Sequence, residues 1–313
     1  MQVNLRIEFK IKSLPRYNQS LYIAPAVKTA YMRGMKFYIM NGAGNRFPIF
    51  DARKAASFVM SADKAKEICT LGSDIMGPKG GDQLIIMRPP KTEAADIFME
   101  IWNREGFQVD ACGNATRCIA WLYLQETDSD KMVLETNDGL LHCTQTGPFE
   151  IAVDMGAPKL EWQQIPIKEA MHTHHMDIKV GPIDDPVLYN PGAVSMGNPH
   201  CVFFVEDFER AKPEKVGPMI EYHPLFPQQA NVGFARIDGR NKIRLRVWER
   251  GVGMTLACGT GACAAVVAAV RQKRTERKVE VVVDGGVLQI DWREEDDHVI
   301  MTGPVEVEFE GTV

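Results

Sequence analysis

The hydrophobic pattern of the chain predicts a protein built mainly from short β-strands. Runs of apolar residues, each bounded by glycine, proline or other turn-forming residues, are typical of strands. In the first half of the chain these runs cover 36–40, 83–88, 95–102, 131–136, 140–144 and 150–155. In the second half they cover 202–205, 232–237, 242–248, 279–283, 287–292 and 299–302. The predicted strands therefore fall into two similar sets.

Each half also contains one long apolar segment that has no polar face. Residues 119–124 follow a Cys-Gly pair in the first half, and residues 264–270 follow another in the second. A helix that is hydrophobic all round is normally buried in a core. We therefore expect an α+β protein with two pseudo-symmetric domains, each a curved, mostly antiparallel sheet or barrel around one central helix.

The sequences around the two Cys-Gly pairs resemble each other. The first reads Ala111-Cys112-Gly113-Asn114-Ala115 and the second, 146 positions later, reads Ala257-Cys258-Gly259-Thr260-Gly261. Their flanks also match, since 101–104 aligns with 247–250 and 138–139 aligns with 284–285. A duplicated unit that presents one thiol from each half predicts a two-thiol site in the cleft between the domains.

A second repeated phrase places the domain boundaries. Met155-Gly156-Ala157-Pro158 resembles Met301-Thr302-Gly303-Pro304, which closes the second half. We expect a first domain of residues 35–154 together with 303–313, and a second domain of residues 155–302. The strand predicted at 305–309 would then return to complete the first domain.

Residues 1–34 form an N-terminal extension with six basic residues and a single acidic one. Three interpretations are open: a basic targeting peptide, a spurious extension ahead of a true start at Met35, or an additional strand at 3–11. We favour an extension that is dispensable.

Composition narrows the class of partner. The rest of the chain has 30 basic and 40 acidic residues, which argues against nucleic-acid binding, whose footprint is a basic patch. There is no apolar run of about 18 residues, so no membrane span is expected. Seven scattered cysteines do not form a secreted disulfide framework, and a cytoplasmic location fits better. The histidines at 172, 174 and 175 are expected to be solvated, with no bound metal.

A cysteine at the start of a helix has a distinct chemistry. The first-turn N–H groups lack intrahelical partners, and the helix dipole adds partial positive charge there. Both effects stabilise a thiolate, so a lowered cysteine pKa is expected. The N–H groups of Gly113, Asn114, Gly259 and Thr260 could also bind a carboxylate from two sides.

Two opposed thiols suit racemisation or epimerisation of an amino acid. One thiolate would remove the α-proton while the other thiol protonates the opposite face, and the converging N–H groups would stabilise the carbanion. No cofactor is expected, because 41–45 (Asn-Gly-Ala-Gly-Asn) lacks the third glycine of a dinucleotide loop. Those glycines are predicted to form a tight turn that presents Asn45.

From about residue 35 to the C-terminus, seven phrases in order resemble the diaminopimelate epimerase family. They are Gly42-Ala43-Gly44-Asn45, Gly81-Asp82-Gln83-Leu84, Asp110-Ala111-Cys112-Gly113-Asn114, Gly197-Asn198-Pro199-His200-Cys201, Ala230-Asn231-Val232-Gly233-Phe234, Glu249-Arg250-Gly251-Val252-Gly253 and 257–265 (Ala-Cys-Gly-Thr-Gly-Ala-Cys-Ala-Ala). The resemblance implies a cofactor-independent isomerase that interconverts LL- and meso-diaminopimelate for lysine and peptidoglycan precursor synthesis. It also implies a homodimer.

The resemblance assigns roles to individual residues. Cys112 and Cys258 are the implied acid/base pair, with His200 and Glu249 assisting proton exchange. The amino-acid centre that does not react would be held by polar side chains lining the cleft, namely Asn45, Gln83, Asn103, Asn198, Asn231 and Arg250. A guanidinium can bind a carboxylate through two parallel hydrogen bonds, which lysine cannot reproduce.

Three positions depart from the family pattern. Ala115 replaces the glycine after Gly-Asn, Arg46 stands where the family commonly has Asp, and Met254 stands where an acidic residue is frequent. None of these changes removes a proposed catalytic group, although they bear on the shape of the first helix start and of the loop over the site.

Several alternative functions are open at this point. One is a racemase or epimerase of the same fold that acts on another acid, such as proline or hydroxyproline. Those relatives usually carry His where Asn114 stands and lack the distal asparagine and arginine set. Others are a dithiol redox or metal-binding protein and a binding module without turnover.

Overall fold

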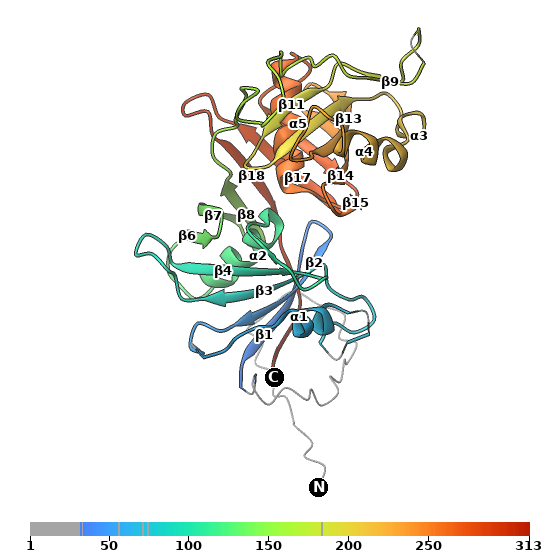
Figure 1. The fold of residues 1–313 in the computed structure, drawn as a ribbon. Coiled ribbons are helices and arrows are strands. Elements are labelled where there is room, and N and C mark those ends of the chain that lie inside the picture. Colours follow the sequence, from blue (N-terminus) through green and yellow to red (C-terminus); the bar gives the residue numbers. More distant parts are fainter. Residues whose placement is uncertain (1–31, 33, 56, 71, 74, 183) are drawn as a thin grey trace.

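Two sets of strands repeat the same order in the computed structural model (Figure 1). The structure describes residues 32, 34–55, 57–70, 72–73, 75–182 and 184–313, so the interpretations of the N-terminal extension lie outside the described residues. The first set is β1 (Lys36–Gly42), β2 (Asn45–Asp51), α1 (Ala62–Cys69), β3 (Gln83–Arg88), β4 (Ile97–Asn103), β5 (Gln108–Val109), α2 (Gly113–Leu124), β6 (Lys131–Thr136), β7 (Gly139–Gly147) and β8 (Glu150–Asp154).

The second set repeats this order after a two-stranded insertion, β9 (Lys179–Val180) and β10 (Leu188–Tyr189). It is β11 (Gly192–Ser195), β12 (Pro199–Phe204), α3 (Phe208–Ala211), α4 (Pro213–Glu221), β13 (Asn231–Gly239), β14 (Lys242–Glu249), β15 (Gly253–Thr255), α5 (Gly259–Arg271), β16 (Lys278–Val283), β17 (Gly286–Trp292) and β18 (Val299–Pro304). The chain ends with β19 (Glu306–Thr312).

Strand pairing follows one scheme in both domains. In the first, β1–β2, β3–β4, β6–β7 and β7–β8 pair antiparallel, while β2–β3 and β4–β6 are parallel. In the second, β11–β12, β13–β14, β16–β17 and β17–β18 are antiparallel, while β12–β13 and β14–β16 are parallel. The α+β fold of two pseudo-symmetric, mostly antiparallel domains is therefore confirmed.

One helix lies at the centre of each domain, as the apolar segments predict. Helix α2 contacts β1, β6, β7 and β8, and helix α5 contacts β11–β14, β17 and β18. Every residue of α5 from Gly261 to Ala269 is buried. Both helices begin at the joint between domains, where they contact each other.

Two strand pairings join the domains. β18 of the second domain pairs antiparallel with β8 of the first, with Ile300 opposite Asp154. The chain then crosses back, and β19 pairs antiparallel with β1, with Phe37 opposite Gly311. Figure 1 shows this last segment running from one domain to the end of the other. The boundaries themselves stay a prediction, which these pairings support.

The domains also meet backbone to backbone at two turns. A Cβ placed on Gly285, between β16 and β17, would lie 2.1 Å from the carbonyl oxygen of Ala43 in the β1–β2 turn. In the pseudo-equivalent pair of turns, a Cβ on Gly197, between β11 and β12, would lie 3.2 Å from Oδ2 of Asp138, between β6 and β7. Only glycine fits at position 285, so this turn sets how closely the domains approach. None of the helices in the described part of the chain is both long and apolar enough to span a membrane.

Gly285→Ala is expected to separate the two domains locally, because the added methyl group meets backbone that has no rotamer to change. We expect turnover to fall at least about tenfold, since a shift of about 1 Å at a catalytic geometry can cost about 100-fold. The matched control is Gly239→Ala, where the nearest atom to the new Cβ is 3.8 Å away. Equal activity in the two variants would contradict this role for Gly285.

Candidate active site

Both cysteines occupy the residue that caps a buried helix. Cys112 precedes α2 with φ −152° and ψ 104°, and Cys258 precedes α5 with φ −126° and ψ 111°. In each case the cysteine carbonyl accepts the first helical hydrogen bond, at 2.9 Å from Thr116 N or Ala262 N. The Gly261 N–H also donates to the Cys258 sulfur at 3.4 Å. The prediction that both thiols lie at helix starts at the domain joint is confirmed geometrically.

Asn114 joins the first helix start to the second domain. Its side chain is 3% exposed. Its Nδ2 donates to Asn45 Oδ1 at 2.5 Å and to the carbonyl of Ala257, the residue before Cys258, at 3.5 Å. Asn45 therefore lies at the first helix start.

Burial changes the expected acidity of both thiols. The low-polarity surroundings raise the pKa of Cys112 to about 11, although the N–H groups of Ala115 and Asn114 act in the opposite direction. Burial also raises the pKa of Cys258 well above its usual value. The expectation of a lowered cysteine pKa is wrong, because desolvation of the thiolate outweighs the helix N–H groups. Both thiols are therefore protonated at neutral pH unless a base removes the proton.

Glu249 is the carboxylate whose charge acts on both the Cys258 and the Cys112 thiols. Burial raises the pKa of Glu249, while the Thr255 hydroxyl, which donates to Glu249 Oε1 at 2.5 Å, acts to lower it. A carboxylate whose pKa is raised is a stronger base, so it can accept a thiol proton more readily.

Two side chains link His200 to the Cys258 sulfur. Its ring is fully buried, and burial lowers its pKa to about 3, so the imidazole is neutral. A chain of contacts leads from it to the thiol: His200 Nε2 to Asn198 Oδ1 at 2.9 Å, Asn198 Nδ2 to Thr260 Oγ1 at 3.3 Å, and Thr260 Oγ1 to Cys258 Sγ at 3.6 Å. His200 is therefore connected to Cys258 through the side chains of Asn198 and Thr260.

Two residues predicted to bind the distal end lie beyond this chain. Asn231 is buried and accepts from Arg250 N at 3.0 Å while donating to the Pro199 carbonyl at 3.1 Å. Its amide therefore fixes the backbone of Arg250. The Arg250 side chain is exposed, and its Nη1 donates to the Gln228 carbonyl at 2.9 Å.

The first domain carries the other two predicted residues on neighbouring strands. Gln83 lies directly opposite Asn103 in the β3–β4 register. The Asn103 side chain accepts from the N–H groups of Glu105 and Phe107 at 3.1 and 2.8 Å, so it shapes its own turn. In this structure the side chains of Asn103 and Asn231 thus both bond to backbone groups.

A polar cavity of about 350 Å³ is lined by residues from both domains. Its lining includes Asn41, Gly44, Arg104 and Leu256. Arg46, one of the three positions that depart from the family pattern, also lines this cavity. Its guanidinium pairs with Glu308 at 2.7 Å and donates to the carbonyls of Met76 and Gly80. Arg46 thereby ties the β19 segment and the loop before β3 to the wall of the cleft.

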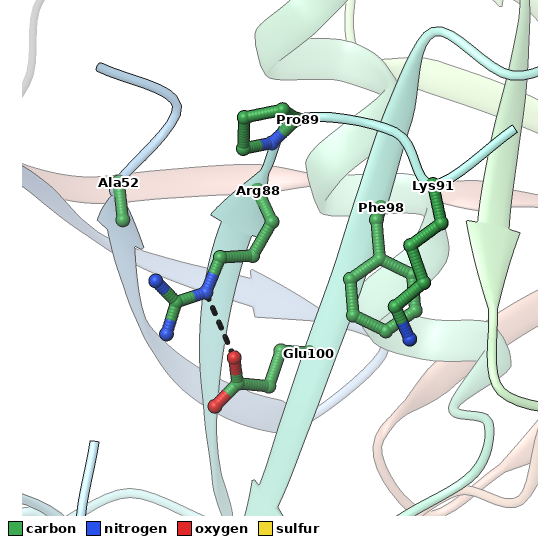
Figure 2. Close-up of a pocket in the computed structure, with 6 residues that line it drawn as sticks. All are labelled: Ala52, Arg88, Pro89, Lys91, Phe98 and Glu100. Atoms are coloured by element: carbon green, nitrogen blue, oxygen red, sulfur yellow. Dashed lines mark hydrogen bonds and ion pairs between the residues drawn. The ribbon is translucent and has the colours of Figure 1, made fainter. Parts of the chain in front are cut away.

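A second cavity, of about 310 Å³, carries none of the predicted site residues (Figure 2). Its charged side chains are engaged with neighbours: Arg88 pairs with Glu100 at 2.8 Å, and Lys91 Nζ lies 3.4 Å above the Phe98 ring. Among the residues that the structure describes, no three His, Cys, Asp or Glu side chains are grouped as metal ligands would be.

Sequence reasoning missed three residues around the helix starts: Thr255, Arg117 and Met301. Arg117 is the one charged residue between Cys112 and the apolar segment 119–124, and it is fully buried. Met301 stands in the repeated phrase that was used only to place a boundary. The lone charge at Arg117 and the repeated phrase at Met301 were both visible in the sequence. The contact of Thr255 with Glu249 depends on a turn geometry that the sequence does not show.

Solved structures share this two-domain fold. A phenazine biosynthesis protein of the PhzF family from Enterococcus faecalis superposes with a TM-score of 0.63 at 14% identity, covering 90% of this chain and 99% of that one. A hydroxyproline epimerase from Agrobacterium vitis superposes with a TM-score of 0.61 at 13% identity, covering 90% and 91%. At such identities the likeness concerns the fold alone.

Sequence relatives define the family. The family model for diaminopimelate epimerase matches residues 37–161 and 192–308. A diaminopimelate epimerase from Caulobacter vibrioides is 47% identical over 281 residues, covering 88% of this chain and 96% of its own length. One from Afipia carboxidovorans is 46% identical over 277 residues, covering 88% and 93%. The chain belongs to the diaminopimelate epimerase family, and it is an isomerase.

Thr255→Val removes a hydrogen bond that stabilises the charged form of Glu249, so the pKa of this carboxyl should rise further. The base would then be protonated up to a higher pH, and the acid limb of the kcat/KM profile should move to higher pH. A hydrogen bond to a charged group contributes about 1.5–3 kcal/mol, which is roughly tenfold or more in kcat/KM on the acid side.

The matched control is Thr146→Val, which removes a surface hydrogen bond of 2.8 Å to Glu150. Its pH profile should overlie that of the unaltered protein. An acid limb that stays in place in Thr255→Val would show that Glu249 is not the titrating base.

Proposed function

We propose that the protein interconverts LL- and meso-diaminopimelate without a cofactor, by means of the Cys112 and Cys258 thiols. The observation that carries this proposal is the meeting of two helix starts, each capped by a cysteine, at the joint of a duplicated fold. The relatives that share 44–47% identity with the chain are named diaminopimelate epimerase, which supports this substrate.

In the proposed reaction the resting thiols are protonated, so the first step is proton transfer from sulfur to a base. Glu249 accepts the proton of Cys258 in one direction. The Cys258 thiolate then removes the α-proton of the substrate, and the Cys112 thiol donates its proton to the opposite face of the same carbon. In the reverse direction the two sulfurs exchange roles. The negative charge that develops on the substrate is stabilised by helix N–H groups.

The backbone at each helix start supplies the carboxylate site. The N–H groups of Gly113 and Asn114, and of Gly259 and Thr260, belong to first turns that lack intrahelical acceptors. A carboxylate on the reacting carbon would therefore be bound from both domains. Thr260 is held in turn by Asn198, as Asn114 is by Asn45.

We further propose that Arg250 binds the distal carboxylate, with Asn231 fixing its backbone. Asn45, Gln83, Asn103 and Asn198 complete the cleft around the amino-acid centre that does not react. A role in lysine and peptidoglycan precursor synthesis, a cytoplasmic location and a homodimer are parts of the same proposal. The dithiol redox, metal-binding and non-catalytic alternatives do not account for a carboxylate, Glu249, whose charge acts on both thiols.

The reaction is tested by incubating reduced protein with LL-diaminopimelate in deuterated water. Deuterium should enter one α-carbon without added cofactor, while L-proline and hydroxyproline, the substrates of the rival proposal, should not exchange.

Cys112→Ala and Cys258→Ala should each lower epimerisation by at least about 1,000-fold, since each removes one of the two proton carriers. Cys201→Ala, which replaces a buried thiol away from the helix starts, is the control. Near-full turnover in either of the first two variants would refute the two-thiol mechanism.

Arg250→Lys tests the distal site. Lysine keeps the charge but cannot form two parallel hydrogen bonds, so the KM for diaminopimelate should rise about tenfold or more. The control is Arg210→Lys, at an arginine that does not line the cavity and whose side chain is 60% exposed. Comparable KM values for the two variants would remove Arg250 from the binding site.

A further inference from the structure

A single methionine side chain lies against both helix starts. Met301, on β18, is fully buried. A Cβ placed on Gly113 would lie 3.0 Å from Met301 Cε, and one placed on Gly259 would lie 2.9 Å from Met301 Sδ. These glycines directly follow the two cysteines. The thioether therefore fills the space between the residues next to Cys112 and Cys258.

The Met301 side chain is itself fixed by a buried cation. Arg117 of α2 is fully buried, and its Nη1 donates to Met301 Sδ at 3.6 Å. Gly303, two residues further along β18, leaves room for this guanidinium, since a Cβ there would lie 3.0 Å from Arg117 Nε. Arg117 thus connects the helix that begins at Cys112 to the strand that carries Met301.

Stability alone does not explain this arrangement. Burying a guanidinium is costly unless its N–H groups are paired. Among the described residues, Arg117 Nε and Nη2 have no hydrogen-bond partner. A methionine beside an unpaired charge is a poor way to fill a core, so the contact serves another purpose.

We infer that Met301, held by Arg117, is a positioning residue that sets the distance between the two helix starts and hence between the two thiols. This inference rests on the proposed two-thiol function. Proton transfer on opposite faces of one carbon requires both sulfurs to be within reach at once, and misplacement of about 1 Å can cost about 100-fold in rate. The glycines at 113 and 259 let the backbone of both helix starts approach the thioether closely.

The first test compares substitutions at position 301. Met301→Ala opens the space between the helix starts and should lower kcat about 100-fold, with KM changing less than about threefold. Met301→Leu keeps the volume and should recover kcat to within about tenfold of the unaltered protein. Met132→Ala, at a buried methionine of the same core on β6, is the control: it should lower the melting temperature similarly while leaving kcat within about twofold.

The second test is a double-mutant cycle in kcat. Arg117→Met should lower kcat about tenfold, and adding Met301→Leu should cost nothing more, because both changes break the same contact. Additive losses would overturn the coupling.

The two proposals fail separately. If Cys112→Ala abolishes turnover but Met301→Ala behaves like Met132→Ala, only the positioning role is overturned. If Cys112→Ala turns over normally, both proposals are overturned. If Met301→Ala does not fold, Met301→Leu and the double-mutant cycle still decide the question, since both keep the core filled.

Discussion

The close approach of two helix N-termini across the domain joint is the constraint on which the rest of the structure depends. Helices α2 and α5 meet there, and the residues after both cysteines are glycines packed on one methionine. Outside this point the domains approach through the turn at Gly285, where backbone meets backbone. A side chain larger than hydrogen at position 285 would meet the Ala43 backbone and push the domains apart there.

This tight joint has an electrostatic consequence. Cys258 is buried and Cys112 is half-buried, and the cost of burying charge raises the pKa of both thiols despite the helix N–H groups. Those N–H groups favour a thiolate only after a base has taken the proton. In the proposed reaction the site therefore needs its own base, and the charge of the Glu249 carboxylate acts on the Cys258 thiol. The low polarity that keeps the thiols neutral also strengthens each hydrogen bond to the charge that develops during the reaction.

Much of the fold could be predicted from the sequence, because strand and helix patterns recur in both halves. The strands at 83–88 and 131–136 match β3 and β6, and the two apolar segments lie within α2 and α5. Strand β2 was missed, since Pro48 interrupts its pattern and cannot donate to a neighbouring strand. The acidity of the cysteines was predicted wrongly, because a sequence shows a helix start but not how deeply it is buried. The contacts of Asn103 and Asn231 with backbone depend on turn conformations that no spacing reveals.

Pseudo-symmetry gives the two thiols equal backbones but unequal neighbours. The second residue of each helix bonds to an asparagine beside the first turn of its domain. Asn114 bonds to Asn45 at the β1–β2 turn, and Thr260 bonds to Asn198 at the β11–β12 turn. The symmetry fails at the ends of β4 and β14, where Asn103 bonds to its own turn and the charge of Glu249 acts on a sulfur. A site with one carboxylate can hold only one thiol ionised at a time, since a second buried negative charge beside it is costly. The proposed reaction removes a proton from one face of the carbon and returns a proton to the opposite face. It therefore needs one sulfur to be a base while the other is an acid, and this asymmetry provides that.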